Sequence, residues 1–143
     1  MSSIEKIISC LEQKNIFLNN IINLTKQIQV KVTNDEIEFE NIIQQRQNNM
    51  DKCDKCDDLI KSTLNEFPAN QKQELAKVLS NNESDYFNDI KLLVKKQIEL
   101  IHIAYELDNV TSAVVNKRYD NLKENLIQSQ NKAIGLNTNK MFR

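Results

Sequence analysis

The chain has 143 residues, with one glycine, one proline and no tryptophan. So few turn-forming and aromatic residues argue against an all-β or α/β fold, because such folds need turn residues between their strands. Nineteen Lys and Arg stand against twenty Asp and Glu, so the net charge gives no reason to expect binding to nucleic acid or to an anionic membrane.

The N-terminal stretch predicts one long amphipathic helix over about residues 3–32. Ser2 and Glu5 form the S-x-x-E pattern of a capping box, which marks the start of a helix. Apolar residues then recur in alternating steps of three and four, the spacing of one helix face. The residues of this face are Ile4, Ile7, Leu11, Leu18, Ile21, Ile28 and Val32.

A second helix is predicted over residues 34–67. Thr33 and Glu36 repeat the capping-box pattern, and Asn34 and Asp35 suit a tight connection between helices. Pro68 ends the segment, because a proline disfavours helical geometry in the residue before it. Arg46 lies on the apolar face of this helix, together with Phe39, Ile43, Met50, Cys53, Ile60, Leu64 and Phe67.

The rest of the chain predicts a short helix over residues 69–80 and a long last helix over residues 84–133. The run SNNES, residues 80–84, suits the turn between them. Gly135 suits a C-terminal cap, and the tail 136–143 is expected to fray. The apolar face of the last helix includes Phe87, Ile90, Val94, Ile101, Ala104, Val115, Leu122 and Leu126.

These segments predict a single all-α domain over residues 1–143, either an antiparallel up-down helical bundle or an extended helical hairpin, of three long helices plus one short helix. The last helix would be about 75 Å long, against roughly 45 to 50 Å for the first two. It must therefore bend at the weak helix formers of DNVTSAVV, residues 108–115, or project beyond the others. A projecting half exposes apolar residues to another copy or to a partner helix.

The stretch DKCDKCDD, residues 51–58, raises the question of a metal or redox site. A structural zinc needs four ligands, and this stretch supplies only two cysteines. A redox C-x-x-C follows a strand, and no strand is predicted before this one. Cys53 and Cys56 share one helix face, so we expect them to pack as small apolar residues. His102, the only histidine, is expected to flank a helix face. We expect no catalytic, cofactor-binding or metal-binding residues.

Arg46 lies between Ile43 and Met50 on the apolar face of the second helix, which allows two interpretations. Its stem can pack while the guanidinium reaches water. Alternatively, Arg46 forms an internal ion pair, with Asp108 as the candidate partner because Asp108 interrupts the apolar face of the last helix.

The sequence also indicates a compartment. The start, MSSIEKIISCLEQ, has no basic region before an apolar run, so we expect no signal peptide. No apolar run approaches the roughly 20 residues of a membrane span. Three cysteines at irregular spacing do not form the pattern of a secreted disulfide framework. We therefore expect a soluble cytoplasmic protein.

Two stretches carry a resemblance to a known family: FENIIQQRQNNMDKCDKCDDLI, residues 39–60, and ELDNVTSAVVNKRYDNLKENLIQSQNKAIGLN, residues 106–137. They resemble the bacterial flagellar export chaperones of the FliT and FlgN type. The second helix of that family has an acid-to-arginine stretch and then an apolar run, which Glu40, Arg46, Met50 and Cys53 fit. The late helix has an L-D-x-x-N-like step and then spaced leucines, which Leu107, Asp108, Asn109, Leu122 and Leu126 approximate. The ending NKAIGLNTNK departs from the family pattern, and the usual terminal tyrosine is missing unless Phe142 takes its place.

The resemblance implies a cytoplasmic chaperone for flagellar type III export, without enzymatic activity or cofactor. Such a chaperone binds the C-terminal helical segment of a late flagellar subunit, either the filament cap protein or a hook–filament junction protein. It prevents premature assembly and delivers the subunit to the export apparatus. We predict that the partner-binding residues are Val114, Val115, Tyr119, Leu122 and Leu126; the alternative role of these residues is intramolecular or homodimer packing. The alternative function is a structural or adaptor coiled-coil protein that acts through self-association.

Overall fold

A computed structural model describes the backbone of residues 1–36 and 38–142 and, within these ranges, the side chains up to residue 131. It contains four helices: α1 Ser3–Thr33, α2 Glu40–Leu64, α3 Ala69–Leu79 and α4 Asn88–Phe142. None of the described residues lies in a strand. The all-α prediction is therefore confirmed.

The three long helices form an open layer in which α1 packs against both α2 and α4. Helices α1 and α2 make an antiparallel hairpin, and α4 lies on the other side of α1. Helix α4 runs in the same direction as α1, because Ile7 packs near Ile90 at one end and Val32 near Val115 at the other. No described Cα atom of α2 lies within 8 Å of one in α4. The layer therefore lacks the contact between its two outer helices that would close it into a bundle.

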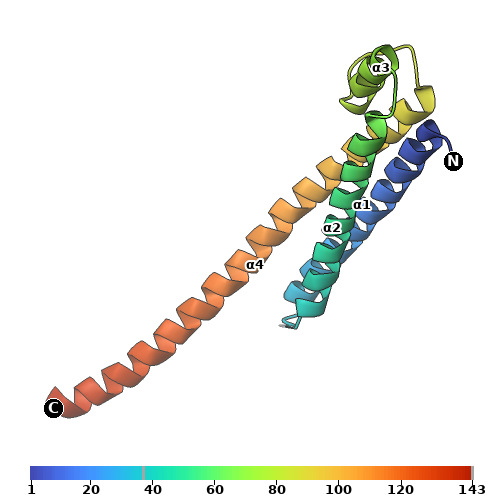
Figure 1. Cartoon of the computed structure of the whole chain (residues 1–143). Coiled ribbons are helices and arrows are strands. Elements are labelled where there is room, and N and C mark those ends of the chain that lie inside the picture. The colour runs from blue at the N-terminus through green and yellow to red at the C-terminus, as the bar shows by residue number, and fades with distance from the viewer. Residues whose placement is uncertain (37, 143) are drawn as a thin grey trace.

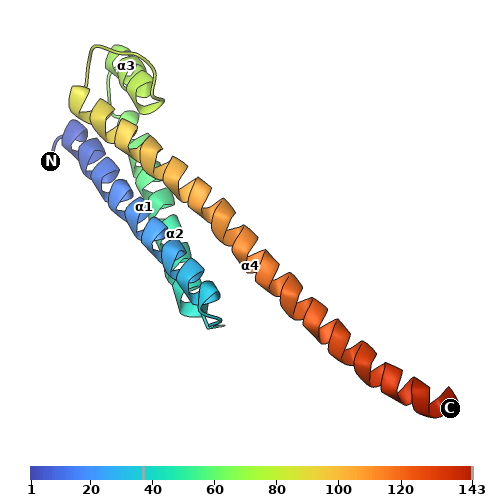
Figure 2. The same ribbon diagram turned by 180° about the vertical axis from the view of Figure 1, so that it is seen from behind.

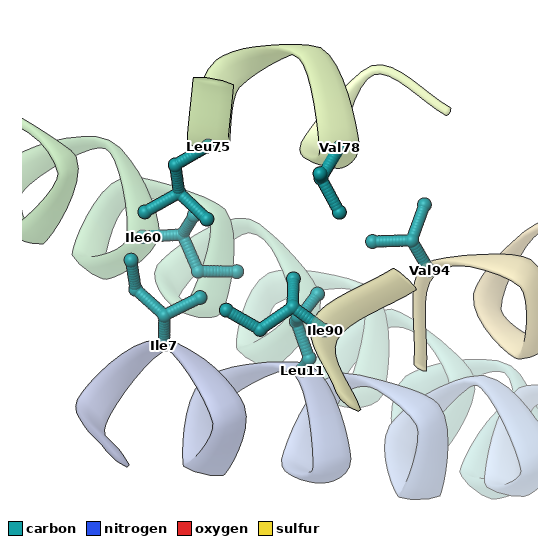
Figure 3. Packing of buried hydrophobic residues seen from close by; sticks show 7 residues of the cluster. All are labelled: Ile7, Leu11, Ile60, Leu75, Val78, Ile90 and Val94. Carbon is teal, nitrogen blue, oxygen red and sulfur yellow. The ribbon is translucent and has the colours of Figure 1, made fainter. Parts of the chain in front are cut away.

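The best-buried core lies at the end of the layer that α3 covers (Figure 3). Leu75 and Val78 of α3 point from above toward side chains of the three long helices. Because this cluster joins all four helices, it fixes the position of the short helix α3. Its residues, all nearly inaccessible to solvent, are Ile7, Leu11, Ile60, Leu75, Val78, Ile90 and Val94.

The start of α1 agrees with the prediction. The Ser2 hydroxyl oxygen accepts a hydrogen bond of 3.1 Å from the backbone N–H of Glu5, as an N-cap does. The apolar face of α1 contributes residues to all three core clusters, since α1 contacts both α2 and α4.

Helix α2 is shorter than predicted at both ends. It begins at Glu40 instead of residue 34, because Thr33 still belongs to α1 and its hydroxyl donates to the Gln29 carbonyl at 2.8 Å. Asp35 then has a φ of 61°, which directs the chain out of the helical path. At the other end, α2 stops at Leu64 instead of residue 67. Helix α3 ends at Leu79, one residue before its predicted end.

Both predicted ends of the last helix, residues 84 and 133, are wrong. Helix α4 begins at Asn88, because Phe87 has a φ of 58° and lies outside the helical region. It continues through Gly135 to Phe142, so Gly135 is not a C-terminal cap and the backbone of the predicted frayed tail is helical as far as residue 142. A glycine inside a helix costs only about 1 kcal/mol relative to alanine, so it need not end one.

Helix α4 passes through residues 108–115 without a break. The sequence left open whether the helix bends at this segment or projects beyond the others. The structure shows that it projects. Thr111 is buried, and Val114 and Val115 pack against the core cluster of Leu24, Ile28 and Val32 of α1 and Ile42 of α2. Such packing outweighs the weak helix propensity of the segment. With 55 residues, α4 is about 82 Å long, and its C-terminal part extends past the α1–α2 hairpin (Figure 1).

Candidate partner-binding surface

The projecting part of α4 carries an exposed apolar stripe formed by Tyr119, Leu122 and Leu126. These side chains are 65 %, 51 % and 60 % exposed. They follow one another at steps of three and four, so they lie on one face of the helix. Tyr119 and Leu122 lie near the end of the α1–α2 hairpin, and beyond it α4 extends away from the other helices (Figure 2). We call these three residues the overhang stripe.

The other two predicted partner-binding residues lie elsewhere. Val114 and Val115 are half-buried, and they pack against the cluster of Leu24, Ile28, Val32 and Ile42. The hairpin ends beside them, so they mark the boundary between the packed and the projecting parts of α4. Their contacts are mainly intramolecular, which is the alternative role that the sequence left open for them.

A small apolar hollow joins the overhang stripe to the end of the hairpin. It has a volume of about 150 Å³. Arg118 borders it and forms an ion pair with Asp35, which fixes the end of the hairpin to α4. The apolar side chains around the hollow are Val32, Phe39, Val115, Tyr119 and Leu122. A ligand on the overhang stripe can therefore also reach Phe39 of the hairpin.

A longer groove lies between α2 and α4, with α1 as its floor. Its middle part has a volume of about 350 Å³. A second hollow of about 320 Å³ continues it toward α3, and Asp57 lines both. The groove exists because α2 and α4 do not pack against each other. Its floor and walls include Leu18 and Ile21 of α1, Met50 and Cys53 of α2, and Ile101, Ala104 and Tyr105 of α4.

Arg46 links the two walls of this groove. Its Nη1 atom lies 3.0 Å from Asp108 Oδ1 on α4 and 3.5 Å from the hydroxyl of Thr25 on α1. Of the two interpretations of Arg46, the ion pair with Asp108 is confirmed. Because Thr25 is buried in the floor and the Arg46 side chain is only 24 % exposed, the guanidinium lies deep in the groove.

The cysteines of DKCDKCDD pack in the core, as predicted. Both are free and buried, and Cys53 lies among Leu18, Ile21, Ile22 and Leu100. Burial raises the pKa of the Cys53 thiol to about 11, although the positive charge of Lys14 partly opposes this. Burial also raises the pKa of Cys56. These thiols are therefore protonated and weakly nucleophilic at neutral pH.

The raised pKa of Cys53 predicts a loss of stability at alkaline pH. Below its ordinary pKa of 9.0 the thiol is protonated in both the folded and unfolded states. Between pH 9.0 and about 11 the unfolded state loses this proton first, so the free energy of unfolding falls as pH rises. Urea unfolding across this window should show a smaller fall for Cys53→Ala than for the unchanged chain. Equal slopes of the free energy of unfolding against pH in the two proteins would contradict the prediction. The cavity left by alanine lowers stability equally at every pH, so it does not affect this comparison.

His102 is exposed on α4, beside the groove-lining residue Ile101. This position agrees with the predicted role as a residue that flanks a helix face. Among the described residues, no group of three or more His, Cys, Asp or Glu side chains is arranged to hold a metal ion. In the same part of the chain, none of the helices has both the length and the apolar character that a membrane crossing requires.

Sequence reasoning missed part of this surface. Tyr105 is 67 % exposed at the groove, and it was not recognised as a surface residue of interest. The sequence feature that could have identified Tyr105 is its position four residues after Ile101, in the same series of three- and four-residue steps that later includes the overhang stripe. Phe39 and Met50 were recognised as apolar, but only the separation of α2 from α4 leaves them beside open hollows.

Comparison with known proteins identifies no relative of this chain. No protein-family model matches it, and no curated protein or solved structure matches it either. The function must therefore be inferred from the surface of the chain itself and from the resemblance of its helices.

Proposed function

We propose that the protein binds an amphipathic helical segment of a partner protein and acts as a flagellar export chaperone. The observation that carries this proposal is the overhang stripe, Tyr119, Leu122 and Leu126, exposed on a helix that extends beyond the rest of the molecule. A contiguous apolar face that the fold leaves largely exposed is typical of a site for another protein.

The spacing of the stripe fits a helical ligand. An amphipathic helix packs its own residues at steps of three and four against a matching series, as in helix-in-groove recognition. The same face of α4 carries Ile101 and Tyr105 in the groove beside α2, with Asp108 and Ser112 interrupting the apolar series between them and the stripe. A long client helix could thus lie along α4 from the overhang into the groove, with Phe39 and Met50 as further contacts.

The resemblance to FliT and FlgN supports the identity of the client class. The client would be the C-terminal helical segment of a late flagellar subunit, either the filament cap protein or a hook–filament junction protein. Covering that segment in the cytoplasm would prevent premature assembly until delivery to the export apparatus. Because ordering a client segment offsets part of the binding energy, the complex can be moderate in affinity and releasable. The role requires no catalysis and no cofactor.

A structural or adaptor role through self-association is the second candidate. The continuous 55-residue helix α4 favours it, because a long projecting helix is a common element of coiled-coil assemblies. This candidate predicts a stable oligomer that does not respond to client segments.

The test measures the molar mass of the full chain by light scattering on a sizing column, alone and with peptides from the C-terminal ends of cap and junction proteins. We expect a one-to-one complex with one peptide. Leu122→Asp should abolish the complex, because it places a charge in the middle of the overhang stripe. Leu92→Asp is the matched control, since Leu92 is also an exposed leucine of α4, 67 % accessible, but lies outside the stripe.

The Leu92→Asp control distinguishes a loss of the binding surface from a general effect of placing a charge on α4. If Leu122→Asp and Leu92→Asp bind the peptide equally well, the overhang stripe is not the client site. If no peptide binds and the chain is a stable oligomer alone, the scaffold role replaces the chaperone role.

A further inference from the structure

We propose that the groove between α2 and α4 takes a client helix whose apolar face is bordered by Lys or Arg, and that Asp54 on α2 selects this positive charge. The inference rests on the proposed function, because it names the chemistry of the client segment. It concerns charge alone, so it can be wrong while client binding itself is right.

The stretch DKCDKCDD on α2 divides its residues between the core and the groove. Cys53 and Cys56 are buried. Asp54 and Asp57 are three residues apart, so they lie on one face of the helix, and both line the middle part of the groove. The wall that α2 contributes to the groove is therefore acidic beside its apolar residues.

The lysines of α2 do not offset this charge inside the middle part of the groove. Lys52 Nζ lies 5.4 Å from the centroid of the Phe17 ring on α1, within the range of a cation–π contact. Neither Lys52 nor Lys55 lines the groove, and Lys61 lines only the hollow toward α3. The middle part of the groove thus faces carboxylates of this stretch and none of its ammonium groups.

The two carboxylates differ in what balances their charge. Asp57 Oδ1 lies 2.7 Å from Lys14 Nζ, and the Lys14 side chain is only 11 % exposed, so these two charges neutralise each other. Asp54 is exposed and has no ion-pair partner among the described residues. One carboxylate therefore remains at the wall of the groove for a cation of the client.

The opposite wall, on α4, supplies apolar contacts. It presents Ile101, Ala104 and Tyr105, and the Asp108 carboxylate beside them is paired with Arg46. A helix that lies on the α1 floor can place its apolar face against the floor and α4, and its charged border against α2. A Lys or Arg on that border gains an ion pair, whereas an Asp or Glu there is repelled.

Two ion pairs set the length of the apolar part of this site. Arg46–Asp108 lies at one end of the middle part, and Lys14–Asp57 lies toward α3. Arg46 and Asp57 are 11 residues apart on α2, since 57 − 46 = 11, which is about 16 Å or three turns of helix. An apolar side chain placed over either pair would strip water from its charges. The client should therefore have an apolar series of about three turns with a polar residue at each end.

The test uses two labelled helical peptides with the same apolar series of about three turns, one bordered by Lys and the other by Glu. Fluorescence anisotropy with the full chain measures both dissociation constants. We expect tighter binding of the Lys peptide, and a preference that decreases as salt is added. Asp54→Asn should weaken binding of the Lys peptide about threefold to fivefold at low salt, the effect of one exposed ion pair. Asp54→Lys should reverse the preference.

Glu12→Gln is the matched control. Glu12 is an exposed carboxylate of α1 that does not line the groove, so its loss changes the net charge of the chain as Asp54→Asn does. This variant should bind the Lys peptide as the unchanged chain does. Circular dichroism of each variant checks that the helices are intact.

Each contrary outcome has its own meaning. If both peptides bind equally, or if Asp54→Asn behaves like Glu12→Gln, the groove does not select positive charge, and the proposal of a helical client stands without this specificity. If neither peptide binds while a cap or junction peptide does, the client lacks the chemistry inferred here. If no peptide of any kind binds, the proposed function is wrong as well.

Discussion

Replacing Leu11 by alanine should lower the free energy of unfolding by about 2 to 5 kcal/mol. Leu11 is 2 % exposed and lies in the cluster where all four helices meet (Figure 3). Alanine is the strongest helix former, so the change leaves the backbone of α1 unaffected and removes only packing. The loss includes both the transfer of the missing methyl groups to water and the cavity that remains.

This loss is large relative to the total stability of a domain, which is about 5 to 15 kcal/mol. Urea unfolding followed by circular dichroism measures it directly. Leu92→Ala is the matched control, because Leu92 is 67 % exposed and its truncation should change stability by less than about 0.5 kcal/mol. If the two variants are equally stable, the cluster at the α3 end is not the main core of the protein.

Replacing Ser112 by proline should destabilise the fold by about 3 kcal/mol or more. Ser112 lies inside α4 and its side chain is exposed, so no side-chain packing is lost. Proline lacks the N–H that bonds to the carbonyl four residues earlier, and its ring clashes with that carbonyl. The neighbours Thr111, Val114 and Val115 contact the hairpin, so a kink at this point also disturbs their packing.

The Ser112→Pro prediction tests the continuity of α4. Ser112→Ala is the control, and it should be neutral or slightly stabilising, because alanine has the higher helix propensity. Urea unfolding and the helical signal in circular dichroism give the comparison. If Ser112→Pro is as stable as Ser112→Ala, the chain already bends at residues 108–115 in solution and the overhang stripe is not rigidly connected to the hairpin.

The elements that the sequence predicted well are those with strong local causes. The cap formed by Ser2 and Glu5 depends on a backbone hydrogen bond within a few residues, so local reasoning is sufficient. Pro68 set only an outer limit for the second helix, because α2 already ends at Leu64. The connection between α1 and α2 was placed incorrectly, because Thr33 can either cap a following helix or bond back to the Gln29 carbonyl, and the structure has the second arrangement.

The exposure of the candidate surface was predicted in part. The alternating apolar series identified Tyr119, Leu122 and Leu126, but the same series includes Val115, which is packed on the hairpin. Periodicity shows which face of a helix is apolar, whereas the length of its neighbours decides which part of that face stays exposed. The Arg46–Asp108 pair was one of two open interpretations, because a sequence does not show which residues of distant helices lie side by side.

Reading the sequence alone was enough to predict that the chain is all-α, which faces of its helices are apolar, and that Cys53 and Cys56 pack in the core. These properties follow from composition and from periodicity along a single helix. Only the packing of the helices shows that α1 contacts both α2 and α4, that a groove remains beside α1, and that α4 continues past the hairpin. The physical reason is that these features depend on which apolar faces bury one another. That choice is made by packing between segments far apart in the chain, and local propensity does not encode it.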